Sequence, residues 1–282
     1  MTVRTTKPEL KQAMQGAHLH SRVERAMFDL VDSLQLQESP VGDVFETFDD
    51  FQQAAIDTTD KWIAVAGATA TIAAIVASPE GKIDMICGTN GTAGVTDAAA
   101  VSSRVLTHGQ AVSLGQIIFE ARVSTSHVTG ATLCVGLSDK IASGSAEAVL
   151  HTVKGEAIAD DGLTVSNALS FAQDSEATDV TAWYATSENA GTIAHVAAAA
   201  DCKLVDDPTP DTYQILRIEV DASGDARFYV DGILRHTELT AVATTAVLVP
   251  YIAVTAEDGT PVATTLSIDY IRFVQTRNPS NA

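Results

Sequence analysis

The residues from Asp211 to Asn278 constrain the fold of this chain more than any other stretch. Apolar and polar side chains alternate along residues 213–220, a pattern that is typical of a half-buried strand and not of a helix. Ser223-Gly224 and Asp231-Gly232 are turn sequences, and a run of β-branched and aromatic residues lies between them. The sequence therefore predicts an antiparallel meander of three strands joined by short turns.

The same kind of pattern extends over most of the chain. Between residues 44 and 276 we count about a dozen strand-like runs at near-regular spacing, separated by turn signals and without helices between them. This arrangement favours an all-β antiparallel sandwich over an α/β fold. We accordingly expect three segments: an N-terminal helical arm at 1–43, a β-sandwich domain at 44–276 and a C-terminal tail at 277–282.

Residues 8–38 form the convincing helical region of the sequence. Pro8 suits a first helical turn, and Ser39-Pro40 ends the pattern. Apolar residues recur at helical spacing and predict an assembly stripe made of Leu10, Met14, Val23, Met27, Leu30, Val31 and Leu34. Such a stripe must be buried against the chain's own β domain, a second copy, or a larger assembly, and the sequence leaves these three open.

Charge and hydropathy exclude several classes of partner. The formal net charge is −19, and a body this acidic repels nucleic acid, because phosphate binding needs clustered Lys and Arg. No apolar run reaches the roughly 18 residues of a membrane span. The N-terminus has no apolar block behind its charges, so we expect no secretory signal.

The residues that commonly bind metals show no paired spacing. Cys87, Cys134 and Cys202 are an odd number and widely separated, which predicts three buried free thiols in a reducing compartment. His18 and His20 would point to different faces of a helix. We therefore predict no metal site and no cofactor.

Several stretches resemble the concanavalin A-like (laminin G-like) jelly rolls. The resemblance to the last strands of that fold rests on residues 215–220, Arg227-Phe228-Tyr229-Val230-Asp231-Gly232, 251–254 and 267–273. The resemblance to its first and middle strands rests on residues 45–51, 62–65, 120–123 and 133–139. It covers residues 44–276 and implies an antiparallel jelly-roll sandwich, a fold that hosts lectins, glycosidases and structural modules.

The overall design is also similar to structural proteins of tailed bacteriophages. It combines a helical arm with a Thr- and Ala-rich jelly roll and a strongly acidic body. This resemblance implies a non-enzymatic virion protein that decorates or cements a capsid, or a tail, through protein–protein contacts. It further implies the major capsid protein or other virion proteins as partners, a homo-oligomer with a trimer favoured, and a virion location after synthesis in the host cytoplasm.

Glycoside hydrolysis is the sharpest enzymatic alternative for this fold, because it needs two carboxylates on one face of a strand. The related glucanases carry them in a Glu-x-Asp-x-x-Glu pattern. The nearest match is Glu219-Val220-Asp221, in which Gly224 replaces the third acidic residue. No Gly-x-Ser-x-Gly, phosphate-binding loop or His-Glu-x-x-His motif is present. We therefore predict no catalytic residues and no enzyme.

The alternative function is a carbohydrate-binding module of a phage tail or fibre protein that contacts host glycans. Trp183 and Tyr184 would supply the stacking face, and the loop Glu257-Asp258-Gly259 would supply calcium ligands. The competing interpretation is that both rings are core or surface aromatics and that the loop is an ordinary turn.

Overall fold

A computed structural model describes most of the β domain. The described residues are 44–52, 55–67, 69–74, 81–88, 98–103, 111–141, 149–160, 165–256 and 262–276. The predicted arm at 1–43, with its stripe from Leu10 to Leu34, and the tail at 277–282 lie outside these residues, so the structure does not support the arm. The three segment boundaries stay predictions.

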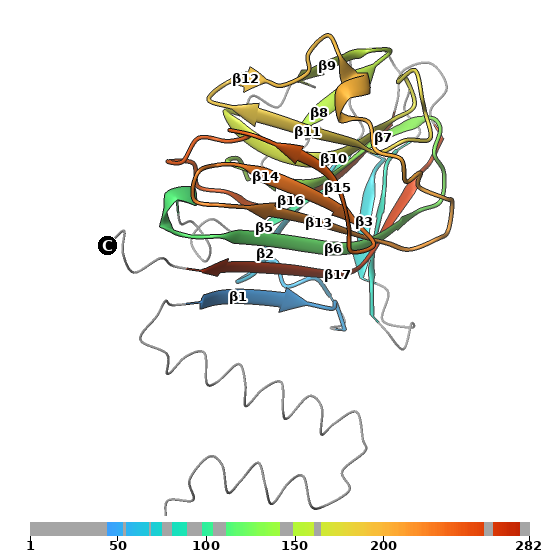
Figure 1. The fold of residues 1–282 in the computed structure, drawn as a ribbon. Helices are drawn as coiled ribbons and strands as arrows, with labels where there is room; N and C mark the ends of the chain where they lie inside the picture. The colour runs from blue at the N-terminus through green and yellow to red at the C-terminus, as the bar shows by residue number, and fades with distance from the viewer. Residues whose placement is uncertain are drawn as a thin grey trace, which may run out of the picture. The chain divides into compact units, whose positions relative to one another are not determined.

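The described part of the chain folds into antiparallel β-sheets, which confirms the predicted all-β class (Figure 1). An eight-stranded sheet has the order β15-β14-β13-β6-β17-β4-β3, with β1 paired to β17. Its strands are β1 (Val44–Asp49), β3 (Thr71–Ala74), β4 (Ile83–Ile86), β6 (Ile117–Thr125), β13 (Gln214–Val220), β14 (Ala226–Val230), β15 (Ile233–Glu238) and β17 (Thr265–Thr276).

A seven-stranded sheet has the order β12-β11-β10-β7-β16-β5-β2. Its strands are β2 (Trp62–Ala66), β5 (Ala98–Ser103), β7 (Ala131–Ser138), β10 (Asn167–Asp174), β11 (Tyr184–Asn189), β12 (Thr192–Ile193) and β16 (Val249–Ala256). A separate hairpin contains β8 (His151–Lys154) and β9 (Ala157–Asp160), and two short 3₁₀ helices are η1 (Val112–Leu114) and η2 (Ala199–Cys202). None of the described helices is long and apolar enough to cross a membrane.

The main core lies between the two large sheets. Buried and half-buried residues alternate strictly along β6, so that Phe119 and Ala121 face inward, as period-two patterning requires. Phe228 of β14 packs edge-on against Phe171 of β10, with ring centroids 5.4 Å apart. None of the three cysteines forms a disulfide, and all three are buried.

The seven-stranded sheet is covered on its outer face as well. Every residue of β7 and of β10 is buried, which an open sheet face would not allow. Two apolar clusters supply the cover. Cys134 of β7 packs with Val149, Leu150 and Val165. Val153 and Ile158 of the β8–β9 hairpin pack with Ala172 and Tyr184.

The predicted meander is confirmed as β13, β14 and β15. Asp231 and Gly232 join β14 to β15 with φ angles of 50° and 79°, the signs that a tight hairpin turn needs. β15 is one edge of the eight-stranded sheet, and β12 is one edge of the seven-stranded sheet. Asn189 Nδ2 donates to the carbonyl oxygen of Thr240 at 2.7 Å, so the two edges meet along one seam.

Candidate functional site

The glucanase-like carboxylates have structural partners. Glu219 lies on β13 and contacts the guanidinium of Arg217, while the hydroxyl of Tyr229 donates to it at 3.1 Å. Asp221 accepts backbone N–H bonds from Ser223 and Asp225 at 2.9 and 3.2 Å. One carboxylate therefore belongs to a polar ladder on the sheet, and the other closes a turn.

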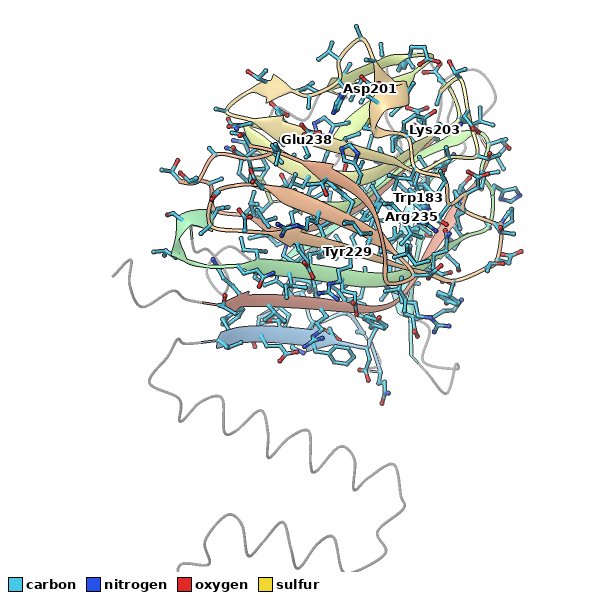
Figure 2. The ribbon with its side chains drawn as sticks, in the orientation of Figure 1. Trp183, Asp201, Lys203, Tyr229, Arg235 and Glu238 are labelled. Atoms are coloured by element: carbon cyan, nitrogen blue, oxygen red, sulfur yellow. The ribbon has the colours of Figure 1, made fainter. Side chains whose placement is uncertain are left out.

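The two aromatic residues predicted to contact glycans are buried. Trp183 and Tyr184 are each only 2% exposed, and Nε1 of Trp183 donates to Oε1 of Gln214 at 2.9 Å (Figure 2). The hydroxyl of Tyr184 donates to the carbonyl oxygen of Asp179, and burial raises the pKa of Tyr184. Neither ring offers a face to a sugar, and the loop 257–259 lies outside the described residues.

A buried polar network lies under the β8–β9 hairpin. Nδ1 of His151 is 3.0 Å from the hydroxyl of Thr186, which is 2.8 Å from the hydroxyl of Ser170. Nε2 of His151 lies 3.4 Å from a carboxylate oxygen of Glu188, and both side chains are buried. The β8–β9 hairpin covers this network and separates it from solvent. The network therefore attaches the hairpin to the sheet and is not accessible to a ligand.

Asp174 is the other buried carboxylate on this face. It accepts backbone N–H bonds from Val153 at 2.7 Å and Glu176 at 2.8 Å, and burial raises its pKa. Glu188 pairs with Ala168, six residues along β10 from Asp174. That offset is about 20 Å along a strand, whereas paired hydrolase carboxylates lie about 5–9.5 Å apart. The two buried carboxylates therefore cannot act as a catalytic pair.

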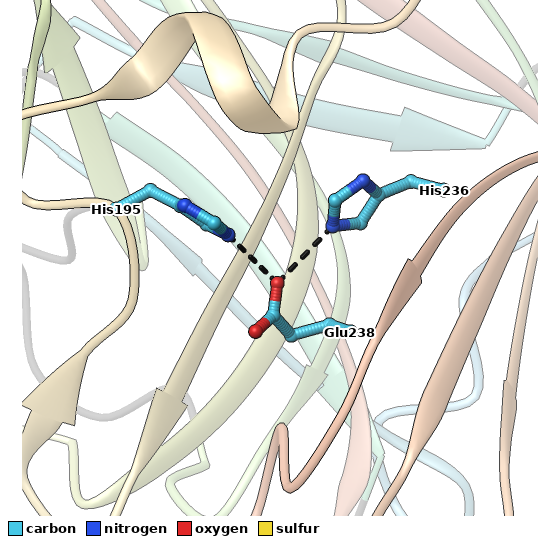
Figure 3. A group of neighbouring side chains, drawn as sticks. All are labelled: His195, His236 and Glu238. Carbon is cyan, nitrogen blue, oxygen red and sulfur yellow. Dashed lines mark hydrogen bonds and ion pairs between the residues drawn. The ribbon is translucent and has the colours of Figure 1, made fainter.

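The seam between the sheet edges holds a more accessible group, which we call the seam cluster: His195, His236 and Glu238 (Figure 3). Oε2 of Glu238 lies 2.7 Å from Nε2 of His195 and 3.1 Å from Nε2 of His236. The two imidazole rings are 6.0 Å apart at 76°. Among the described residues, only this group brings three metal-ligating side chains together within 4.8 Å.

Local structure explains how the seam cluster forms. His236 and Glu238 are two residues apart on β15, so both side chains point to the same face of the strand. His195 lies in the turn after β12 and adopts a φ of 56°, a left-handed conformation that is uncommon outside glycine. The third member therefore comes from the other sheet.

A hollow of about 370 Å³ opens beside the seam cluster and shares Glu238 with it. Its lining is mixed, with polar side chains set in a largely apolar surface, and consists of Ser187, Asn189, Thr192, Ile193, Ala194, Glu238, Thr240 and Ala241. The side chains of the seam cluster are partly exposed, at 24% for His195, 16% for His236 and 19% for Glu238. Small molecules and ions can therefore reach the cluster.

The electrostatic field at the seam is negative. Burial, followed by the negative charge of Glu238, raises the pKa of Cys202 to about 12. Asp201 adds a second carboxylate, whose Oδ2 lies 4.0 Å from Nδ1 of His195. These two carboxylates favour a cation at the seam. The prediction of no metal site was made without considering His195, His236 and Glu238. The His236-x-Glu238 spacing on a strand was the available signal.

Comparison with known proteins identifies the fold. No family model matches the chain, and neither does any curated protein. The carbohydrate recognition domain of Emp47p aligns with a TM-score of 0.50 and 10% identity, over 79% of this chain and 93% of that chain. A Bacillus licheniformis β-glucanase aligns with a TM-score of 0.52 and 12% identity, over 81% of this chain and 97% of that chain.

A LamA variant from Zobellia galactanivorans, solved with laminaritriose and laminaritetraose, aligns with a TM-score of 0.53 and 13% identity. The alignment covers 84% of this chain and 99% of that chain. At these identities the likeness shows the fold alone, and the fold is the predicted concanavalin A-like jelly roll.

The comparison contradicts the predicted function. The similar structures are mostly glycoside hydrolases, with a carbohydrate recognition domain among them, and nothing supports a phage virion origin. The predicted virion role and the prediction of no enzyme are therefore wrong: the jelly-roll pattern that suggested a capsid protein also occurs in carbohydrate-active proteins. The predicted virion partners, trimer and virion location are not tested by these findings.

Proposed function

We propose that this chain binds carbohydrate, in the hollow between β12 and β15. The observation that carries the proposal is a hollow with several polar side chains, at an accessible seam of a fold shared with β-glucanases and a carbohydrate recognition domain. Its volume of about 370 Å³ is within the range of small-ligand sites. The other polar clusters described above are either buried or occupied by internal contacts.

The lining matches the chemistry of a neutral sugar. Thr192 and Thr240 carry hydroxyls, Asn189 carries an amide, and Glu238 carries a carboxylate that accepts hydroxyl hydrogen bonds. The net charge of −19 opposes the approach of sulfated or uronic acid polymers. We therefore expect a neutral glycan as the ligand.

Hydrolysis of a glycan is the second candidate, because two carboxylates flank one imidazole at the seam. Glu238 approaches Nε2 of His195 (Figure 3), and Asp201 approaches Nδ1 of the same ring. Inverting glycosidases hold their two carboxyl groups about 6.5–9.5 Å apart with the scissile bond and a water between them, so hydrolysis here requires the His195 ring to leave the space between the carboxylates. In this case Glu238, the more buried of the two, would be the general acid.

A polysaccharide panel tests both candidates. The chain should bind at least one neutral glycan, by array and then by calorimetry, and Thr192→Ala should weaken that binding several-fold. Thr237→Ala is the matched control, because Thr237 is exposed on β15 and does not line the hollow. Equal loss in both variants, or no binding to any neutral glycan, would overturn the proposal.

The hydrolytic candidate has its own readout. If the chain cleaves a bound glycan, new reducing ends should appear, and Glu238→Gln should slow their release by about 100-fold or more. Binding without any reducing-end release leaves carbohydrate binding as the function and rejects hydrolysis.

A further inference from the structure

We propose that the seam cluster of His195, His236 and Glu238 is a binding site for a divalent transition-metal ion, with zinc as the best-fitting ion. The inference does not depend on carbohydrate binding. It rests on the three donors, their spacing and the group behind one of them.

The donor set selects the class of metal. Two imidazole nitrogens and one carboxylate oxygen suit zinc and its transition-metal neighbours, whereas calcium and magnesium prefer oxygen ligands alone. Zinc sites with three protein ligands keep a fourth position for water or another small ligand. The partial exposure of all three side chains leaves that position open to solvent.

The donors lie near the spacing that zinc needs, and the two imidazole nitrogens would approach each other by at most about 1.5 Å. Ligand atoms of a tetrahedral zinc ion lie about 3.3 Å apart when each is about 2.0–2.1 Å from the metal. Oε2 of Glu238 is 2.7 and 3.1 Å from the two Nε2 atoms, so the carboxylate would withdraw by a few tenths of an ångström. The two nitrogens already lie within 4.8 Å of each other.

His195 has a carboxylate behind it, as metal-bound histidines commonly do. Oδ2 of Asp201 lies 4.0 Å from Nδ1, the nitrogen that faces away from Glu238. A proton on Nδ1 would point toward Asp201 and leave the lone pair of Nε2 for the metal. The left-handed backbone of His195, with φ at 56°, is the kind of strained conformation that accumulates at functional sites.

Without a metal, the same residues form a clamp in which one carboxylate accepts hydrogen bonds from two imidazoles. This clamp would join the two sheet edges but would give no reason for zinc to bind. Direct titration of the metal separates the two interpretations.

The test is calorimetric titration of zinc chloride into the full chain at neutral pH, after treatment with chelator and without any sugar. We expect one strong site, with metal content confirmed by elemental analysis. His236→Ala should weaken binding at this site by at least about tenfold. Magnesium chloride should give no comparable heat.

Two further variants serve as controls for this titration. His127→Ala removes a histidine whose ring contacts Ser126 outside the cluster, and it should leave zinc affinity unchanged. If His236→Ala fails to fold, His236→Gln preserves a similar volume and should lose zinc affinity in the same way. Absence of a strong site, or a strong site that survives both His236 variants, would overturn the inference. Loss of glycan binding alone would leave it standing.

Discussion

Cys202 lies fully buried at the end of η2, with its sulfur 3.3 Å from the carbonyl oxygen of Ala199. Burial and the nearby charge of Glu238 raise the pKa of its thiol to about 12, so the reactive thiolate is scarce at neutral pH. We predict that iodoacetamide does not label Cys202 in the folded protein and does label it in denaturant. Peptide mass spectrometry measures both, and rapid labelling without denaturant would contradict the assignment.

The ion pair of Lys203 with Asp179 illustrates an exposed contact at the same scale. Hydrogen bonding to Lys203, then to Thr181, lowers the pKa of Asp179 below its ordinary 3.8. Its stabilising contribution is therefore present above pH 3.8 and is lost as the pH falls through the lowered value.

We predict that Lys203→Met raises the pKa of Asp179 toward 3.8 and changes the stability little, because the pair is exposed to solvent. Carboxyl NMR titration measures the pKa, and urea unfolding measures the stability. Lys154→Met is the control, since Lys154 pairs with Glu176 at 2.8 Å and should leave the pKa of Asp179 unchanged. An unchanged pKa in Lys203→Met would show that the pair is not formed.

At the scale of elements, the attachment of β8 to the seven-stranded sheet depends on buried polar groups. His151 is the β8 residue that contacts Thr186 and faces Glu188, and all three are buried. We predict that His151→Ala lowers the free energy of unfolding by about 3 kcal/mol or more, because it leaves Glu188 buried without its ring.

A double-mutant cycle checks this attachment. Glu188→Gln should remove part of the cost of His151→Ala, so the double variant should be more stable than the sum of the single losses predicts. Urea unfolding of the four proteins gives the interaction energy. Strict additivity would mean that His151 and Glu188 do not interact.

The pairing of β7 with β10 depends on Gly136, which stands opposite Ser170. A Cβ atom at this position would lie 2.0 Å from the carbonyl oxygen of Leu169, in the backbone of the neighbouring strand. We predict that Gly136→Ala destabilises the protein by about 1–3 kcal/mol or more. Gly191→Ala, whose Cβ meets nothing within 4 Å, should cost less despite a φ of 80°, and thermal unfolding compares the two. Equal losses would contradict this packing.

Many of the strands and the meander were predictable, because alternation along β6 and the turn at Asp231 are local signals, whereas the order of strands in the two sheets was not predicted. Proline within a strand usually marks an edge or a bulge, yet Pro250 lies in β16, a central strand between β7 and β5. The proline fits because the pairing of β16 with β5 begins one residue later, at Tyr251. Whether Trp183 is buried could not be decided from the sequence either, because the core around it is assembled from strands that are far apart in the sequence.

The candidate site could be predicted only in part. His236 and Glu238 share a strand, and their two-residue spacing places them on one face. His195 lies 41 positions before His236, in the turn after β12, and only the meeting of the two sheet edges brings it to Glu238. No local pattern encodes a contact of that kind.

At the scale of the whole molecule, the described part of the sandwich has an accessible hollow beside a cluster of metal-ligating side chains. Both lie where the edges of the two sheets meet, and the β8–β9 hairpin covers part of the second face of the seven-stranded sheet. The acidic surface should keep charged polymers away from this seam and permit neutral glycans. The proposal therefore places the bound carbohydrate at one location, the hollow between β12 and β15.

A crystal structure of the chain with the tightest-binding neutral oligosaccharide tests this location most directly. The proposal predicts density for a sugar in the seam hollow, with hydroxyls within hydrogen-bond distance of Asn189, Thr192 or Glu238. Density for the sugar on any other surface, with the seam hollow occupied only by water, would contradict it.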